Sequence, residues 1–307
     1  MLSVPRLLCS TLRPPALLAL AILIGFSAPA TAQSSDTNPG RPLTARTIHS
    51  GHSLTDPIPD LLRQMVTVSG VRGAVVDRST IAGSPMEARW EHRPHESMPD
   101  AKSEIANYDT LIITERVPLS NTMPWHNSET VTLQWFEHAW NRGNGGDGAE
   151  TILYASWPEI SSGPDWDNPY NDPEGHIPWR ERLPLEMARW EQIADYVNAN
   201  RPEGSPALRV VPGPLIFGAA YDDIQAGRAP GVRSIANFFT DDIHTNDWGT
   251  YLISVAHFAV VYGRDPRGLP HRLGQQRPPT PEMADWMQEV VWKVVTEYDR
   301  TGIRVGQ

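Results

Sequence analysis

The stretch TARTIHSGHSLTDPIPDLL, residues 44–62, passes from a strand-like run directly into a helical pattern. Residues 46–50 predict a short strand that breaks at Gly51. Apolar residues then recur at the spacing of one helix face, namely Ile58, Leu61, Leu62, Met65 and Val66. The pattern ends at Gly70. A strand followed at once by a helix is the first part of a β–α–β unit, so this stretch favours an α/β fold.

The remaining chain repeats this alternation. Further strands are predicted at residues 71–79, 108–115, 150–157 and 207–213. Helices are predicted at residues 128–143, 178–200, 214–227, 246–263 and 281–302. Ser128 is the expected N-cap of the first of these helices, and Gly143 its stop. The alternation predicts a three-layer α/β/α sandwich around a central five-stranded parallel sheet.

The first 32 residues have the features of a secretory signal peptide. Arg6 and Arg13 precede an apolar run at residues 16–26, and Ala30-Thr31-Ala32 forms a small-residue cleavage site. The apolar run is too short to cross a bilayer, which takes about 20 residues, and no later segment is long enough. We therefore expect an exported protein, periplasmic or extracellular, without a membrane span. Residues 33–45 form a polar leader, and residues 46–307 are expected to fold as a single domain because no internal repeat is present.

Composition excludes several classes of function. The one cysteine, Cys9, belongs to the signal segment, so the mature chain has no disulfide, cysteine nucleophile or thiolate metal site. The formal charge of −10 becomes −12 once the two arginines of that segment are removed. Such an acidic chain argues against a nucleic-acid partner, whose phosphates need a basic surface.

Ligands of open parallel sheets bind beyond the carboxyl ends of the strands, and Ser53 follows the first predicted strand directly. A serine in a tight turn at this edge exposes its hydroxyl, and nearby backbone amides stabilise a developing anion. The alternative is that Ser53 only caps the following helix, as serines often do.

A partner for such a nucleophile occurs in FFTDDIHTNDWGTYL, residues 238–252. Asp241 and His244 are spaced as Asp-x-x-His just before a predicted helix, which allows the carboxylate to orient the imidazole. Asp242 is a competing orienting residue. The alternative is an acidic capping turn that carries a surface histidine.

Together, Gly-His-Ser-Leu at residues 51–54 and Asp-x-x-His at residues 241–244 resemble the SGNH, or GDSL-type, hydrolase superfamily. The resemblance implies a flavodoxin-like fold in which Ser53 is the nucleophile and Asp241 and His244 complete a triad. His52 replaces the usual acidic residue, at a position outside the triad. In this family a loop glycine after the second strand, here Gly83, adds its N–H to that of Ser53 in the oxyanion hole.

The third block of the family, Gly-x-Asn-Asp after the third strand, is where this chain departs from the pattern. Glu115 and Arg116 stand where a glycine is expected, and Asn121 and Asn127 are the candidates, both out of register, for the missing side-chain amide. An ionised Glu115 beside an oxyanion would oppose its charge. We therefore expect Glu115 either to point away, paired with Arg116, or to be held protonated, and we count both residues as candidates for substrate binding.

The segment at residues 156–184 is long, proline-rich and aromatic, which is typical of a functional loop. Its four aromatic side chains offer flat faces of the kind that sugar rings contact, Trp157, Trp166, Tyr170 and Trp179. The alternative is that they pin the loop to the core. The acidic residues of this segment do not match an EF-hand, and no histidines have the spacing of a zinc motif, so we expect neither a metal nor another cofactor.

The sequence thus predicts an exported serine hydrolase that acts on a small-molecule or polysaccharide ester, with a carbohydrate O-acetyl group as the expected target. Other esters, of lipids or of sulfate, are alternatives. A non-catalytic carbohydrate-binding or scaffold protein that retains the fold is a third.

Overall fold

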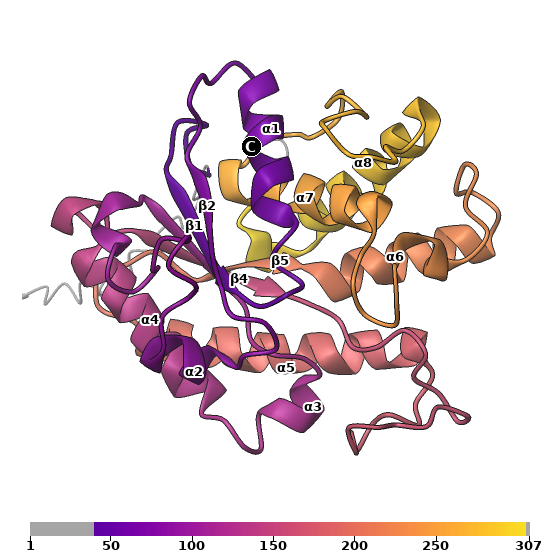
Figure 1. The fold of residues 1–307 in the computed structure, drawn as a ribbon, viewed down its shortest axis with the longest axis horizontal. Coiled ribbons are helices and arrows are strands. Elements are labelled where there is room, and N and C mark those ends of the chain that lie inside the picture. Colours follow the sequence, from indigo (N-terminus) through magenta and orange to yellow (C-terminus); the bar gives the residue numbers. More distant parts are fainter. Residues whose placement is uncertain (1–39, 305–307) are drawn as a thin grey trace, which may run out of the picture. The chain divides into compact units, whose positions relative to one another are not determined.

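The computed structural model describes residues 40–304 (Figure 1). Its five strands form one parallel sheet in the order β2-β1-β3-β4-β5. They are β1 (Thr47–Gly51), β2 (Val76–Thr80), β3 (Thr110–Ile113), β4 (Glu150–Ala155) and β5 (Arg209–Pro212). The five-stranded parallel sheet predicted from the sequence is confirmed. The predicted signal peptide lies outside the described residues, which all belong to one compact unit.

Helices cover both faces of the sheet (Figure 1). One layer contains α1 (Ile58–Val68), α7 (Asp247–Tyr262) and α8 (Pro281–Glu297). The opposite layer contains α2 (Met86–Glu91), the short α3 (Leu119–Thr122), α4 (Ser128–Arg142) and α5 (Trp179–Asn200). The helix α6 (Gly213–Gln225) continues from β5 and packs between α5 and α8. Four short 3₁₀ helices lie at Ile105–Asn107, Asn144–Gly146, Ile235–Phe238 and Asp299–Thr301.

Burial follows from this layering. Every residue of β1, β3, β4 and β5 is buried, as expected for parallel strands that are covered on both faces. The edge strand β2 is partly open at Asp77 and Arg78. In α7 every residue from Gly249 to Tyr262 is buried, so this helix is a central part of the core rather than a surface helix.

Several predicted boundaries were wrong. The strand predicted from residue 71 begins at Val76, because residues 69–75 form turns. The helix predicted at residues 128–143 contains Ser128 as its first residue, and its N-cap is Asn127, which makes no side-chain cap bond. The helix predicted to reach residue 302 ends at Glu297, and a 3₁₀ turn follows.

The strand order determines where a ligand can bind. The chain leaves β1 toward β2 on one side, whereas β3 on the other side of β1 leads toward β4. The loops after β1 and β3 therefore diverge and leave a crevice at the carboxyl end of the sheet. No helix within residues 40–304 is both long enough and apolar enough to span a bilayer.

Candidate active site

The turn after β1 presents Ser53. It begins at Gly51, where a Cβ atom would lie 2.1 Å from Thr55 Oγ1, so the close approach of Thr55 requires glycine. The helix α1 starts only at Ile58, five residues after Ser53, and its N-cap is Pro57. Ser53 therefore does not cap the helix, and the capping alternative is wrong.

The three residues of the predicted triad form a hydrogen-bonded chain. Ser53 Oγ lies 2.8 Å from His244 Nε2, and His244 Nδ1 lies 2.8 Å from Asp241 Oδ2. An acceptor carboxylate at Nδ1 favours the tautomer in which Nδ1 carries the proton, and this leaves Nε2 free to accept the Ser53 proton. The arrangement is that of a serine activated by a positioned base.

Backbone contacts fix the geometry of the histidine. Asp241 Oδ1 accepts hydrogen bonds from the backbone N–H groups of Ile243, at 2.9 Å, and of His244, at 2.7 Å. Asn246 then caps α7 by accepting from the N–H groups of Trp248 and Gly249. The loop between the 3₁₀ helix Ile235–Phe238 and α7 is thus a short, hydrogen-bonded turn that holds the Asp241 carboxylate against the His244 imidazole.

Asp241, not Asp242, orients the histidine. Asp242 Oδ1 instead accepts hydrogen bonds from Ser161 N, at 2.8 Å, and from Ser161 Oγ, at 2.6 Å. Burial alone would raise the pKa of Asp241, but the hydrogen bonds from the His244 and Ile243 amides and from the His244 ring lower it overall. The ionised form that the histidine needs is therefore favoured.

Gly83 lines the same cavity as Ser53, as the resemblance implied. Its φ of +63° lies in the left-handed region, where a side chain would be strained, although a Cβ atom there would meet nothing within 4 Å. Within residues 40–304, neither the Ser53 nor the Gly83 backbone N–H donates a hydrogen bond. Both donors are therefore available to an anion in the cavity.

Glu115 is fully buried and does not line the cavity. Its Oε1 accepts hydrogen bonds from the backbone N–H groups of Met86 and Arg116, both at 2.7 Å. The nearby charge is the buried Arg89: burial lowers the pKa of its guanidinium to about 10, and Glu115 opposes that shift. The expectation that Glu115 points away is correct, but its carboxylate is bonded to the backbone N–H groups of Met86 and Arg116 rather than to the Arg116 side chain. Its assignment to substrate binding was wrong.

His52 joins this buried group. Its Nε2 donates to the Glu115 carbonyl oxygen at 3.0 Å, and its Nδ1 accepts from the Leu54 N–H at 3.4 Å. Burial, together with the charge of Arg89, lowers the pKa of His52 to about 3. The ring is therefore neutral and helps to hold the turn that carries Ser53.

The cavity in front of Ser53 has a volume of about 420 Å³. Beside Ser53 and His244, its polar lining combines donors and acceptors from two segments, the one between β3 and α4 and the one between β4 and α5: Arg116, Asn121, Thr122, Glu159 and Tyr170. Its apolar lining consists of Leu54, Val117, Pro118 and Ile243. Small apolar surfaces beside a few polar groups are typical of sites for small molecules.

The two asparagine candidates for a third oxyanion donor are both engaged elsewhere. Asn121 lines the cavity, but its amide N–H donates to the Tyr170 carbonyl oxygen at 2.9 Å. Asn127 lies outside the cavity lining, and its amide donates to Glu87 Oε1 at 3.3 Å.

Of the four aromatic residues predicted to contact substrate, Tyr170 alone lines this cavity. Trp157 and Trp179 are buried in the core, where their indole N–H groups donate to the carbonyl oxygens of Ile243 and Pro158. Trp166 lines a separate surface pocket. The prediction was therefore wrong for Trp157 and Trp179, which pin the loop to the core, whereas Trp166 lies outside the cavity beside Ser53.

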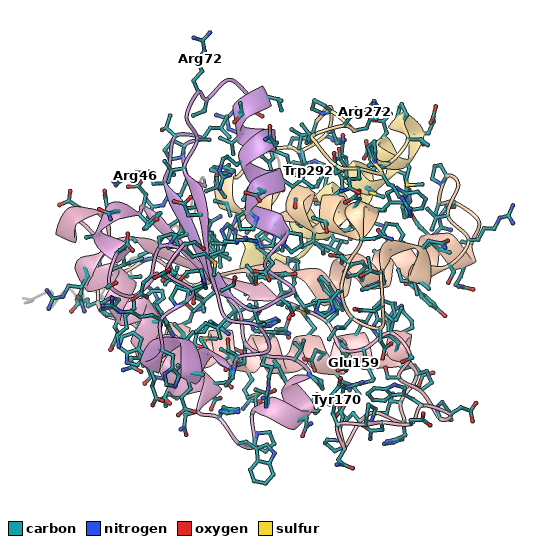
Figure 2. The ribbon with its side chains drawn as sticks, viewed as in Figure 1. Arg46, Arg72, Glu159, Tyr170, Arg272 and Trp292 are labelled. Atoms are coloured by element: carbon teal, nitrogen blue, oxygen red, sulfur yellow. The ribbon has the colours of Figure 1, made fainter. Side chains whose placement is uncertain are left out.

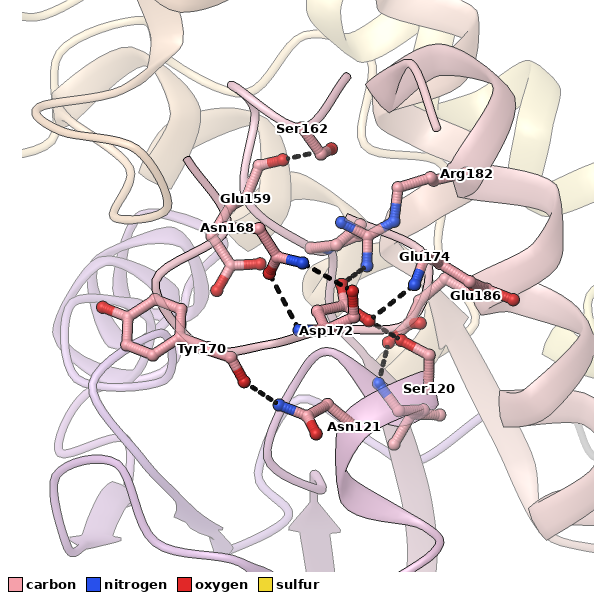
Figure 3. Close-up of polar contacts among 12 residues, drawn as sticks. Ser120, Asn121, Glu159, Ser162, Asn168, Tyr170, Asp172, Glu174, Arg182 and Glu186 are labelled. Carbon is pink, nitrogen blue, oxygen red and sulfur yellow. Dashed lines mark hydrogen bonds and ion pairs between the residues drawn. The ribbon is translucent and has the colours of Figure 1, made fainter. Parts of the chain in front are cut away.

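A buried polar network holds the loop that carries Tyr170 (Figure 3). Asp172 pairs with Arg182 of α5, and its Oδ1 accepts from Ser120 Oγ at 2.6 Å. Glu186 accepts from the Leu119 N–H at 2.7 Å, and burial raises the pKa of Glu186 to about 8. These contacts tie residues 156–178 to α3 and α5.

Glu159 is a site residue that the sequence analysis missed. It lies four residues beyond the end of β4, is 6% exposed and lines the cavity beside Ser53. Figure 2 places it close to Tyr170, in the segment that joins β4 to α5. Its position just beyond a strand end was the available signal, but no motif distinguishes it from the other acidic residues of the segment.

A second and larger cavity, of about 750 Å³, lies between α2 and α4 and does not include Ser53. Three of its charged side chains already have partners, since Lys102 donates to the Trp90 carbonyl oxygen and Arg93 lies 3.6 Å from Asp100. No three His, Cys, Asp or Glu side chains within residues 40–304 are grouped as metal ligands.

Comparisons with known proteins bear on the fold alone. The chain matches no protein-family model and no curated protein. Among solved structures it is similar to a DUF4886 family protein from Bacteroides uniformis, with a TM-score of 0.57 and 11% sequence identity. The match covers 82% of this chain and 94% of that chain. The three-layer α/β architecture is therefore one that this chain shares with a DUF4886 family protein.

Proposed function

We propose that this chain is a serine hydrolase of the SGNH type that cleaves carboxylic esters, with an O-acetyl group on a carbohydrate as its target. The observation that carries the proposal is the chain of two 2.8 Å contacts from Ser53 Oγ through His244 to Asp241. Ser53 and His244, which lie 191 positions apart in sequence, meet in this row of hydrogen bonds. A histidine in a merely structural turn would need no serine partner.

The reaction follows from the positions of these groups. Ser53 Oγ attacks the acyl carbon, and its proton moves to His244 Nε2 while Asp241 stabilises the imidazolium. The backbone N–H groups of Ser53 and Gly83 stabilise the oxyanion of the tetrahedral intermediate. As the bond to the alcohol oxygen breaks, His244 returns its proton to the leaving alcohol. Water then attacks the acyl carbon of the acyl-serine while His244 accepts a proton from the water. The bond between the acyl carbon and Ser53 Oγ breaks, His244 returns the proton to Oγ, and the carboxylic acid leaves.

The oxyanion hole of this proposal has two backbone donors. Loss of a third donor costs on the order of 10² to 10³ in kcat in enzymes that depend on one. We therefore expect a slower hydrolase than one with three donors, rather than an inactive protein. We also propose, from residues 1–32 alone, that the protein is exported.

Product release tests the proposal. Purified protein is incubated with acetylated xylan, with short-chain glycerides and with an aryl sulfate, and free acetate, fatty acid and sulfate are measured. We expect acetate from xylan and none from the Ser53→Ala variant. Release of fatty acid or of sulfate alone would reassign the substrate class. No release by well-folded protein from any of the three would favour a carbohydrate-binding protein without chemistry.

A further inference from the structure

Glu159 differs from the other buried carboxyl groups around the site. Glu115 and Glu186 each accept a backbone hydrogen bond at 2.7 Å. The Oε2 atoms of all three glutamates are enclosed without a partner, but the Glu159 carboxyl group accepts no hydrogen bond from another residue within residues 40–304 at its Oε1 either. Of these three glutamates, Glu159 is also the one that lines the cavity. A carboxyl group held without donors costs free energy, unless a ligand supplies the missing donor.

The backbone around Glu159 is held firmly against the histidine loop. Trp157 Nε1 donates to the Ile243 carbonyl oxygen at 3.0 Å, and the Ile160 N–H donates to the Asp242 carbonyl oxygen at 2.8 Å. These two bonds flank Glu159 and fasten it beside the turn that carries His244. Glu159 thereby forms part of the wall of the cavity that Ser53 and His244 also line.

The charges around Glu159 favour a neutral, hydrogen-bonding partner. Burial raises the pKa of Glu159 to about 6; its own backbone N–H and Arg182 oppose this shift, while Asp172 and Asp242 add to it. At neutral pH most of the population is therefore ionised and acts as an acceptor only. Arg116 lines the same cavity and would repel a cationic ligand. A hydroxyl group suits both residues, since it donates to Glu159 and accepts from Arg116.

We propose that Glu159 is a specificity-determining residue, which accepts a hydrogen bond from a free hydroxyl group on the alcohol part of the ester. This rests on the function proposed above. In Figure 3 the Glu159 carboxyl group points toward the side of the loop that carries Tyr170. Tyr170 is a lining residue of the cavity, and a tyrosine ring offers a flat apolar face for a sugar ring. The site therefore selects partly acylated polyols, in which a hydroxyl group remains free beside the acyl group, over fully acylated ones.

The test compares three acetyl esters. Methyl β-D-xylopyranoside monoacetate has free hydroxyl groups, its triacetate has none, and 4-nitrophenyl acetate has a leaving group without any. For Glu159→Gln we expect kcat/KM to fall about tenfold to hundredfold on the monoacetate, because a charged hydrogen-bond partner is lost. We expect kcat/KM on the other two esters to change little. Glu181→Gln, an exposed carboxylate on α5, is the matched control and leaves all three unchanged.

Three outcomes overturn the inference: an equal loss on all three esters, which would make Glu159 merely structural; no loss on any of them; and a wild type that does not favour the monoacetate over the triacetate.

A binding measurement keeps the inference separate from the proposed function. Ser53→Ala protein is titrated calorimetrically with methyl β-D-xylopyranoside, with and without Glu159→Gln. We expect Kd to rise about tenfold with Glu159→Gln. An unchanged Kd, or no binding, contradicts the role of Glu159 even if esterase activity is found. If binding depends on Glu159 but no ester is hydrolysed, the proposed function is contradicted instead.

Discussion

Asp241 and Asp242 are neighbours in the chain with different partners, and this difference gives a prediction at the scale of single residues. We expect Asp241→Asn to lower kcat on the order of 10⁴-fold, because an amide at this position no longer stabilises the imidazolium and favours the wrong tautomer. Asp242→Asn should change kcat by less than about threefold, because an amide oxygen still accepts both bonds from Ser161. Steady-state kinetics on 4-nitrophenyl acetate separate the two. Equal losses in both variants would mean that the acidic turn, not one carboxylate, supports the histidine.

The same residues show what sequence could and could not predict about the site. Ser53, Asp241 and His244 were predictable because each sits in a short pattern whose spacing has a chemical reason. Glu159 was not predictable, because what distinguishes it is a buried carboxyl group without a hydrogen-bond donor. That environment depends on loops far apart in sequence. Glu115 was misassigned for the same reason, since the Met86 N–H that binds it belongs to another element.

At the scale of elements, the loop between β4 and α5 depends on one buried ion pair. The side chains of Asp172 and Arg182 are 0% and 1% exposed. Asp172→Ala leaves the Arg182 charge without its partner, so we expect a loss of about 3 to 5 kcal/mol in the free energy of unfolding. Adding Arg182→Met should recover part of that loss, because the unpaired charge is removed. Urea denaturation of both single variants and the double variant measures this coupling. Additive losses would show that the pair is not coupled.

The aromatic residues of this loop show the limit of prediction at this scale. Trp157 and Tyr170 come from the same segment, and composition treats them alike. Trp157 packs against Phe217 of α6, with ring centroids 4.5 Å apart, whereas Tyr170 is 62% exposed. Which aromatic residue faces a core and which faces a cavity depends on where α6 lies, and local spacing does not contain that information. The five strands and the six longer helices were predictable, because their apolar periodicity is local. The short helices α2 and α3 were not predicted, because six and four residues are too few to show a helical period.

At the scale of the whole molecule, buried histidines make stability depend on pH. His257 in α7 is fully buried and packs against Tyr154 and His49. Burial lowers the pKa of His257 to about 4 and that of His49 well below its usual value. Because the unfolded chain takes up these protons near pH 6.5, stability is present above that pH and is lost as pH falls toward 4.

His257→Phe tests this dependence, since phenylalanine keeps the ring contact and does not titrate. For His257 alone we expect about 2 kcal/mol of the stability lost between pH 7 and pH 5 to disappear in the variant. Guanidinium unfolding of both proteins at the two pH values measures the difference. An equal loss of stability in wild type and variant would mean that other groups, such as His49 and His52, account for the whole loss of stability between pH 7 and pH 5.

The measurement that tests the central claim most directly is the labelling of Ser53 by a fluorophosphonate, which reacts with an activated serine by loss of fluoride. We predict one label per chain, mapped to Ser53 by peptide mass spectrometry, and none on Ser53→Ala. We also predict at least about a 10³-fold slower labelling of His244→Ala, since the 2.8 Å contact to its Nε2 is what activates the hydroxyl. Labelling of folded wild-type protein at another serine, none at all, or an undiminished rate in His244→Ala would contradict the account.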